Sequence, residues 1–153
     1  MKLGDVLRKE RVKKKLSVEE VAERLGIPAG EWQAMEEGES PAEEWGPRLA
    51  LLAIELETPT SRLLAESGRF ADTRHGQAGE LIRGHRERRQ KSPAAMAEAA
   101  GITESEYREI EAGTSALETY GPRFLGFSEA IEQPVFNLFY PCGLPFQELD
   151  DYP

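Results

Sequence analysis

The sequence predicts an all-α protein made of two tandem five-helix domains. Apolar residues recur at the spacing of one helix face along most of the chain. Ser, Thr and Gly stand where such helices would begin and end. The two halves of the chain also resemble each other, so one helical fold is expected twice. No segment needs a strand to explain its pattern.

The repeat sets the expected domain boundaries. Residues 3–64 align with residues 78–139 at a constant offset of 75, without a gap. Nineteen of the 62 aligned positions are identical, which chance explains poorly. A chain of 153 residues is long enough for two small domains. We therefore predict a first domain over 1–68, a linker over 69–77, and a second domain over 78–153 that ends in an apolar tail.

The first domain carries start and stop signals for five helices. The first helix is expected from Leu3 to about Lys14. Ser17 and Glu20 can form a capping box at the start of the second helix, and Gly26 ends it. The remaining helices are expected from about Pro28 to Gly38, from about Glu43 to Ile54, and after Pro59.

The second domain follows the same plan. Ser92 and Pro93 begin its second helix, Gly101 ends that helix, and Thr103 caps the third. The tail over 135–146, VFNLFYPCGLPF, is the most apolar stretch of the chain. It is expected either to complete the core of the second domain, or to cover the first domain or form a homodimer contact.

Composition restricts the setting and the partners. The formal net charge of −9 argues against general affinity for nucleic acid or anionic membranes, although a local basic patch stays open. One cysteine, Cys142, excludes an internal disulfide and fits a reducing compartment. The first residues lack the apolar core of a secretory signal, and no apolar stretch is long enough to span a membrane. We expect a cytoplasmic protein without a membrane partner.

The order of these motifs resembles one known family. The residues LRKERVKKKLSVEEVAERLGIPAGEWQAMEEG and IRGHRERRQKSPAAMAEAAGITESEYREIEAG each show a helix with Arg, a capped eight-residue helix, a Gly-Ile turn and another helix ending at Gly. This order is similar to the lambda-repressor-like, or XRE, helix-turn-helix family. The resemblance covers about 60 residues in each half. It implies a helix-turn-helix fold, which most members of the family use to bind DNA.

The resemblance also assigns structural roles. It implies ion pairs between the first and third helices of each copy, Arg11 with Glu36 and Arg86 with Glu111. We expect these pairs to hold the fold rather than to contact a ligand. Gly38 and Gly113 are expected just past the third helices, where a positive φ is favoured.

The family's DNA-reading positions fall on the third helix of each copy. By resemblance, the candidate recognition faces consist of Ala29, Gly30, Gln33 and Ala34 in the first copy and Glu104, Ser105, Arg108 and Glu109 in the second. Good base readers carry side-chain donors, which Ala and Gly lack. The surroundings are acidic, with six Glu and no Lys or Arg over residues 26–47. These faces therefore suit a polypeptide better than a duplex.

A basic stretch in each copy gives the opposite indication. Candidate contacts to phosphate or to a partner protein are Lys13, Lys14, Lys15, Ser17, Arg88, Arg89, Lys91 and Ser92. Three interpretations stay open: a solvated face that balances the acidic one, docking onto an acidic protein surface, and contact with a phosphate backbone.

Other residues that can carry chemistry favour structural roles. Trp45 and Tyr120 stand at matched positions and are expected in the core, or exposed as contacts for a protein partner. Cys142 is expected to be an inert packed thiol. The sequence has no phosphate loop, metal-ligand set or catalytic triad pattern, so we expect no enzyme, cofactor, metal or small-molecule ligand.

Two functions follow from these observations. The first is a tandem helix-turn-helix regulatory protein that binds another protein, such as a basic one, through acidic and small-residue faces. The second is a DNA-binding transcriptional regulator that uses its two copies as a pseudo-dimer within one chain. The residues of the faces favour the first function, and the family resemblance favours the second.

Overall fold

The computed structural model describes residues 2–143, and all of its regular structure there is helical. The first half holds α1 (Leu3–Lys13), α2 (Val18–Leu25), α3 (Ala29–Glu36), α4 (Ala42–Leu56) and α5 (Thr60–Leu64). The second half holds α6 (Gln77–Arg88), α7 (Pro93–Ala100), α8 (Glu104–Ala112), α9 (Leu117–Ile131) and α10 (Phe136–Phe139). Short 3-10 turns lie at Phe70–Asp72 and Tyr140–Cys142. The all-α prediction is confirmed.

Local sequence signals explain where these helices begin and end. The hydroxyl of Ser17 accepts from the backbone N–H of Glu20, whose carboxylate accepts from the N–H of Ser17 in return. Thr103 and Glu106 form the same capping box at α8. Gly26 and Gly101 then end α2 and α7 in the left-handed conformation, with φ of 68° and 71°. The capping predictions at these positions are confirmed.

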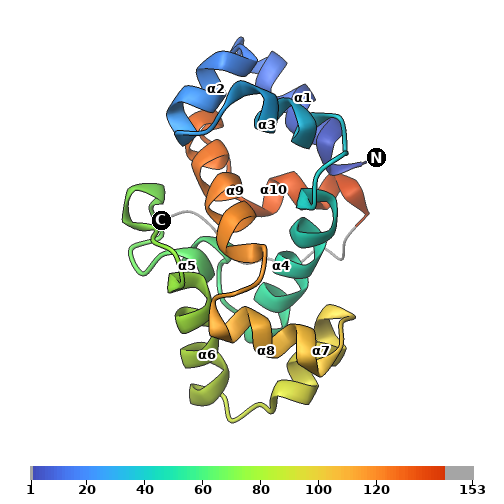
Figure 1. Cartoon of the computed structure of the whole chain (residues 1–153), viewed down its shortest axis with the longest axis vertical. Coiled ribbons are helices and arrows are strands. Elements are labelled where there is room, and N and C mark those ends of the chain that lie inside the picture. Colours follow the sequence, from blue (N-terminus) through green and yellow to red (C-terminus); the bar gives the residue numbers. More distant parts are fainter. Residues whose placement is uncertain (1, 144–153) are drawn as a thin grey trace.

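The two halves exchange helices. In Figure 1, α1–α3 lie at one end of the long axis and α6–α8 at the other, while α4 and α9 run between them. The second half's α9 packs on α2, and the first half's α4 packs on α7. Likewise α5 packs on α6, and α10 packs on α1. Each three-helix unit therefore has its core completed by helices from the other half.

The buried residues accordingly form one core rather than two. Trp32 on α3 lies against Phe127 on α9, with ring centroids 4.7 Å apart. Both rings are fully buried, as are residues of every helix that joins the halves. The expected boundaries, at residues 68 and 78, therefore mark the two copies of the repeat along the chain. They do not separate two cores, because the buried residues of both halves pack together.

The apolar tail lies against the first half of the chain, which is one of the positions expected for it. Phe139 lies edge-on to Phe124 of α9, at a centroid separation of 5.6 Å, and lies close to Gly46 of α4. With α10 packed on α1 and α4, the described part of the tail covers the first half. Residues 144–146 of the expected tail lie outside the described residues.

A matched carboxylate holds the start of each unit. Glu43 accepts from the backbone N–H groups of Leu3 and Gly4, at 3.2 and 2.8 Å, at the start of α1. Glu118, 75 residues later, accepts from Gly76 and Gly79 at 2.7 and 3.0 Å. A carboxylate is favourable there because the first N–H groups of a helix lack partners within the helix. Both glutamates therefore stabilise the fold by binding the first N–H groups of α1 and α6.

Candidate functional site

An ion pair fixes the third helix of each unit against the first. Nε and Nη2 of Arg11 lie 2.5 and 3.0 Å from the two carboxylate oxygens of Glu36. The remaining nitrogen, Nη1, donates to the carbonyl of Leu16 in the corner before α2. The bond with Glu36 raises the pKa of Arg11, so the guanidinium stays charged. This geometry orients α3 relative to α1 and α2.

The second half repeats the arrangement. Arg86 lies 2.6 and 3.0 Å from the oxygens of Glu111, and its Nη1 donates to the carbonyl of Lys91. Burial opposes ionisation of Glu111, but the hydrogen bond and charge of Arg86 outweigh it and hold the pKa of Glu111 below its ordinary value. Both glutamates point inward and are occupied by fold-holding bonds.

The outward face of α3 is small and nearly neutral. Gly30 and Gln33 are exposed, while Ala29 and Ala34 are half-buried. The Gln33 side chain donates to the carboxylate of Glu37 one turn later, at 3.2 Å. Gln33 is therefore the one candidate reading residue of this face with a side-chain donor.

The outward face of α8 is polar. Glu104, Ser105, Arg108 and Glu109 are all exposed. Arg108 binds Glu104 through Nε and Nη2, at 3.0 and 2.8 Å, so these two charges offset each other at the helix surface. Ser105 and Arg108 supply the donors here that the first half lacks.

Many of the glutamates near these faces have partners inside the fold. Glu31 accepts a 2.6 Å bond from Arg123 of α9, and its counterpart Glu106 lies 3.8 Å from Arg48 of α4. Glu36, Glu43, Glu111 and Glu118 hold the contacts described above. The formal sum of −6 over residues 26–47 therefore overstates the negative charge that a ligand would meet. The acidic character inferred from the sequence is weaker in three dimensions.

Residues 2–53 match a family model described as a helix-turn-helix domain. The match covers α1 to α3 and most of α4, which is 52 of the 153 residues. The searches of curated proteins and of solved structures gave no match. Within the matched residues, α2 and α3 are the consecutive helices that would form the helix-turn-helix pair, and Gly26 ends α2 at the turn between them.

The basic corners of the two halves differ in their contacts. Lys13, Lys14 and Lys15 are exposed, and within residues 2–143 none forms an ion pair. In the second half, Lys91 binds Glu55 at 2.8 Å and Arg89 donates to the hydroxyl of Thr58. Arg88 lies 3.0 Å from Nδ1 of His85. The second corner thus partly serves to hold the halves together.

The two serines expected at these corners begin helices. Ser17 accepts from the backbone of Glu20, and Ser92 from the backbone of Ala95, at 3.0 and 3.1 Å. Each bond uses a lone pair of the hydroxyl oxygen and leaves the O–H able to donate. Contact with a phosphate is compatible with the cap.

Trp45 is not an exposed contact residue. It is 8% exposed, and Arg48 lies over its ring at 4.8 Å. Tyr120 is half-buried beneath Arg123 in the same way, at 5.2 Å. The aromatic rings support the arginines that join the halves, which explains why an aromatic residue precedes Gly-Pro-Arg in both copies.

Sequence reasoning missed those joining arginines, although the repeat contains a signal for them. Arg48 and Arg123 are identical at matched positions, and so are Glu31 and Glu106. These two charged positions, retained in both copies, indicate paired contacts, but the sequence does not show that each pair connects different halves.

The structure of residues 2–143 gives little support for a reactive thiol, a metal site or a membrane span. Burial raises the pKa of Cys142, whose Sγ lies 3.6 Å from the carbonyl of Leu138, so the thiol is a poor nucleophile. Residues 2–143 bring no three His, Cys, Asp or Glu side chains together as metal ligands. Over the same range, every helix is too short or too polar to cross a bilayer.

Proposed function

We propose that this protein is a regulatory protein that binds duplex DNA through its two helix-turn-helix units, held as a pseudo-dimer within one chain. The observation that carries the proposal is the reciprocal pairing of Arg123 with Glu31 and of Arg48 with Glu106. Reciprocal contacts are typical of two-fold related units. Helix-turn-helix dimers place two recognition helices along a duplex in this manner.

The charge distribution supports DNA over the first interpretation of the sequence. Three of the six glutamates over residues 26–47, Glu31, Glu36 and Glu43, bind an arginine or helix N–H groups within the fold, which removes much of the expected repulsion. Gln33, Ser105 and Arg108 are exposed donors on the outward faces. Arg can read guanine and Gln can read adenine in the major groove. We infer that the second unit supplies most of the base contacts.

A polypeptide partner is the second candidate, and the face of α3 is the observation that favours it. Ala29, Gly30 and Ala34 form a small-residue surface without side-chain donors. Such a surface allows close approach of another helix but offers nothing to a base edge. A partner with basic residues would suit the exposed Glu37 and Glu39 beside it.

A salt titration tests the proposal. Random-sequence duplex is titrated at low and high salt, and affinity is expected to fall steeply as salt rises because counterions are released. Arg108→Glu should weaken binding strongly, whereas Arg62→Glu on α5 makes the same charge change away from α8 and should have a small effect. Binding weaker than about 10⁻⁴ M at low salt, where non-specific binding is ordinarily tighter, would refute DNA binding and favour the polypeptide partner.

A further inference from the structure

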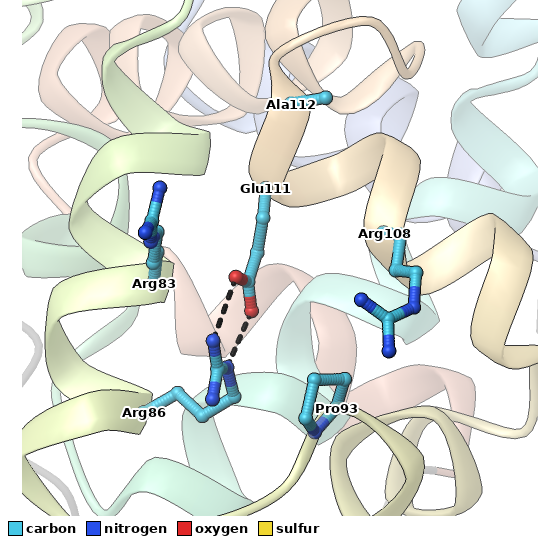
Figure 2. A pocket seen from close by; sticks show the side chains of 6 residues that line it. All are labelled: Arg83, Arg86, Pro93, Arg108, Glu111 and Ala112. Carbon is cyan, nitrogen blue, oxygen red and sulfur yellow. Dashed lines mark hydrogen bonds and ion pairs between the residues drawn. The ribbon is translucent and has the colours of Figure 1, made fainter.

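We infer that the pocket between α6 and α8 is a binding site for one phosphate-type oxyanion, present in the second half alone. The pocket has a volume of about 310 Å³ and is lined by Arg83, Arg86, Pro93, Arg108, Glu111 and Ala112. Figure 2 shows Arg83 and Arg108 on opposite sides of the Arg86–Glu111 pair. Three guanidinium groups around one small pocket indicate an anionic ligand.

The Arg86–Glu111 pair forms a fixed and nearly neutral part of this pocket. Arg86 uses Nε, Nη1 and Nη2 for Glu111 and the carbonyl of Lys91, and its side chain is 14% exposed. The negative charge of Glu111 is matched by Arg86 and does not repel a ligand strongly. The charge available to an anion is therefore that of the other two arginines.

Arg83 and Arg108 are available because their present partners are weak. Arg83 lies 3.4 Å from Glu87 and Arg108 lies 2.8 Å from Glu104, and both pairs join residues one turn apart on an exposed helix surface. Pairs of this kind contribute little to stability. An oxyanion between the two arginines would accept charge-assisted bonds from both helices. Exchange of Glu87 and Glu104 for such a ligand therefore costs little stability.

The first half lacks this chemistry at matched positions. Arg8 and Arg11 correspond to Arg83 and Arg86, but Gln33 and Glu37 stand where Arg108 and Ala112 stand in the second half. Arg8 also lies 3.7 Å from Glu36, which holds its charge within the ion-pair cluster. The site should therefore bind one anion per chain, and Arg8 provides a matched control.

The ligand chemistry can come from two sources, a backbone phosphate of DNA or a free phosphate group. Both present the same oxygens to Arg83 and Arg108. This inference does not depend on the proposed function, because free phosphate would bind even if the protein bound no duplex.

The experiment uses the full chain and inorganic phosphate, followed by NMR with sodium chloride at equal ionic strength as reference. Phosphate should shift backbone resonances of α6 and α8 and saturate at one site. Arg83→Gln and Arg108→Gln should each weaken binding by about tenfold, and Arg8→Gln should leave it unchanged. All three side chains are exposed at the surface, and circular dichroism verifies that each variant is folded.

The outcomes separate the alternatives. Shifts identical to those in sodium chloride would overturn the site, as would an equal loss on Arg8→Gln. If a short duplex displaces bound phosphate and Arg83→Gln, which lies outside the candidate reading face, also weakens duplex binding, the source is a DNA phosphate; if Arg83→Gln leaves duplex binding unchanged, the site takes free phosphate. Phosphate binding in a protein that fails to bind duplex would refute the proposed DNA function and leave this site intact.

Discussion

Arg123 on α9 donates a 2.6 Å hydrogen bond to Glu31 on α3, although the two residues lie 92 positions apart in the chain. The side chain of Arg123 is 13% exposed and also covers the ring of Tyr120. Its counterpart, Arg48, lies 3.8 Å from Glu106 and is more exposed. These two reciprocal arginine–glutamate contacts help to join the halves, and they differ in geometry.

This difference predicts unequal stability losses. Arg123→Ala removes a charged hydrogen bond and the packing of a largely buried stem, and should lower the free energy of unfolding by about 1–2 kcal/mol after allowance for the half-exposed Glu31. Arg48→Ala should cost less, because its ion pair is longer and more exposed. Urea denaturation of both variants measures the difference. A larger loss for Arg48→Ala would contradict this account of the contact.

The exchange of helices predicts how an isolated half behaves. A fragment of residues 1–75 retains α1–α5 but lacks α9 and α10, which cover α2 and α1. We expect two fragments to exchange their α4 and α5 and form a homodimer, since the repeat makes each half a substitute for the other. Light scattering after gel filtration, with circular dichroism over a range of concentrations, measures this. A stable, fully helical monomer would show that the exchange is dispensable.

Two glycines provide a paired test of packing. A Cβ at Gly4 would stand 2.6 Å from the carbonyl oxygen of Met35, where α1 crosses the end of α3. Gly4→Ala should therefore destabilise the fold by about 1–3 kcal/mol. A Cβ at Gly30 meets nothing within 4 Å, so Gly30→Ala in exposed α3 should stabilise by about 0.5–1 kcal/mol. Thermal melts of both variants distinguish the effects; equal shifts would argue against the close crossing.

The ion pair of the second unit predicts a dependence of stability on pH. The pKa of Glu111 is lower in the folded protein than its ordinary value of 4.5. A carboxyl with a depressed folded pKa contributes stability above the unfolded pKa, and this contribution is lost as the pH falls through the folded pKa. Stability should therefore decline below about pH 4.5.

The variant Glu111→Gln isolates that contribution. It should be less stable than the original protein at pH 7, and its stability should fall less between pH 5 and the lowest pH at which both proteins still fold. Denaturant titrations at several pH values measure both slopes. If the free energy of unfolding falls equally with pH in the two proteins below pH 5, Glu111 contributes nothing to the decline.

Local structure and the repeat could be predicted from the sequence. Helix starts at Ser17 and Thr103 follow from hydroxyls that bond to backbone groups three residues away, and the left-handed Gly26 and Gly101 end α2 and α7. The pairs of Arg11 with Glu36 and of Arg86 with Glu111 came from the family resemblance, and the structure places both pairs in contact. These features depend on short-range bonds or on motifs of fixed spacing.

The partners of α4, α5, α9 and α10 were decided by the tertiary structure alone. Because the two halves are similar, a helix can complete its own unit or the other unit with nearly the same side chains, and periodicity cannot distinguish these cases. The choice is made by long-range packing such as Trp32 on Phe127. The same packing gives Glu31 to Arg123 and brings Arg83 and Arg108 to one pocket. The sequence by itself thus determined which helices form and where they end. Only the folded chain determined which half each helix stabilises, and so which charges stay available to a ligand.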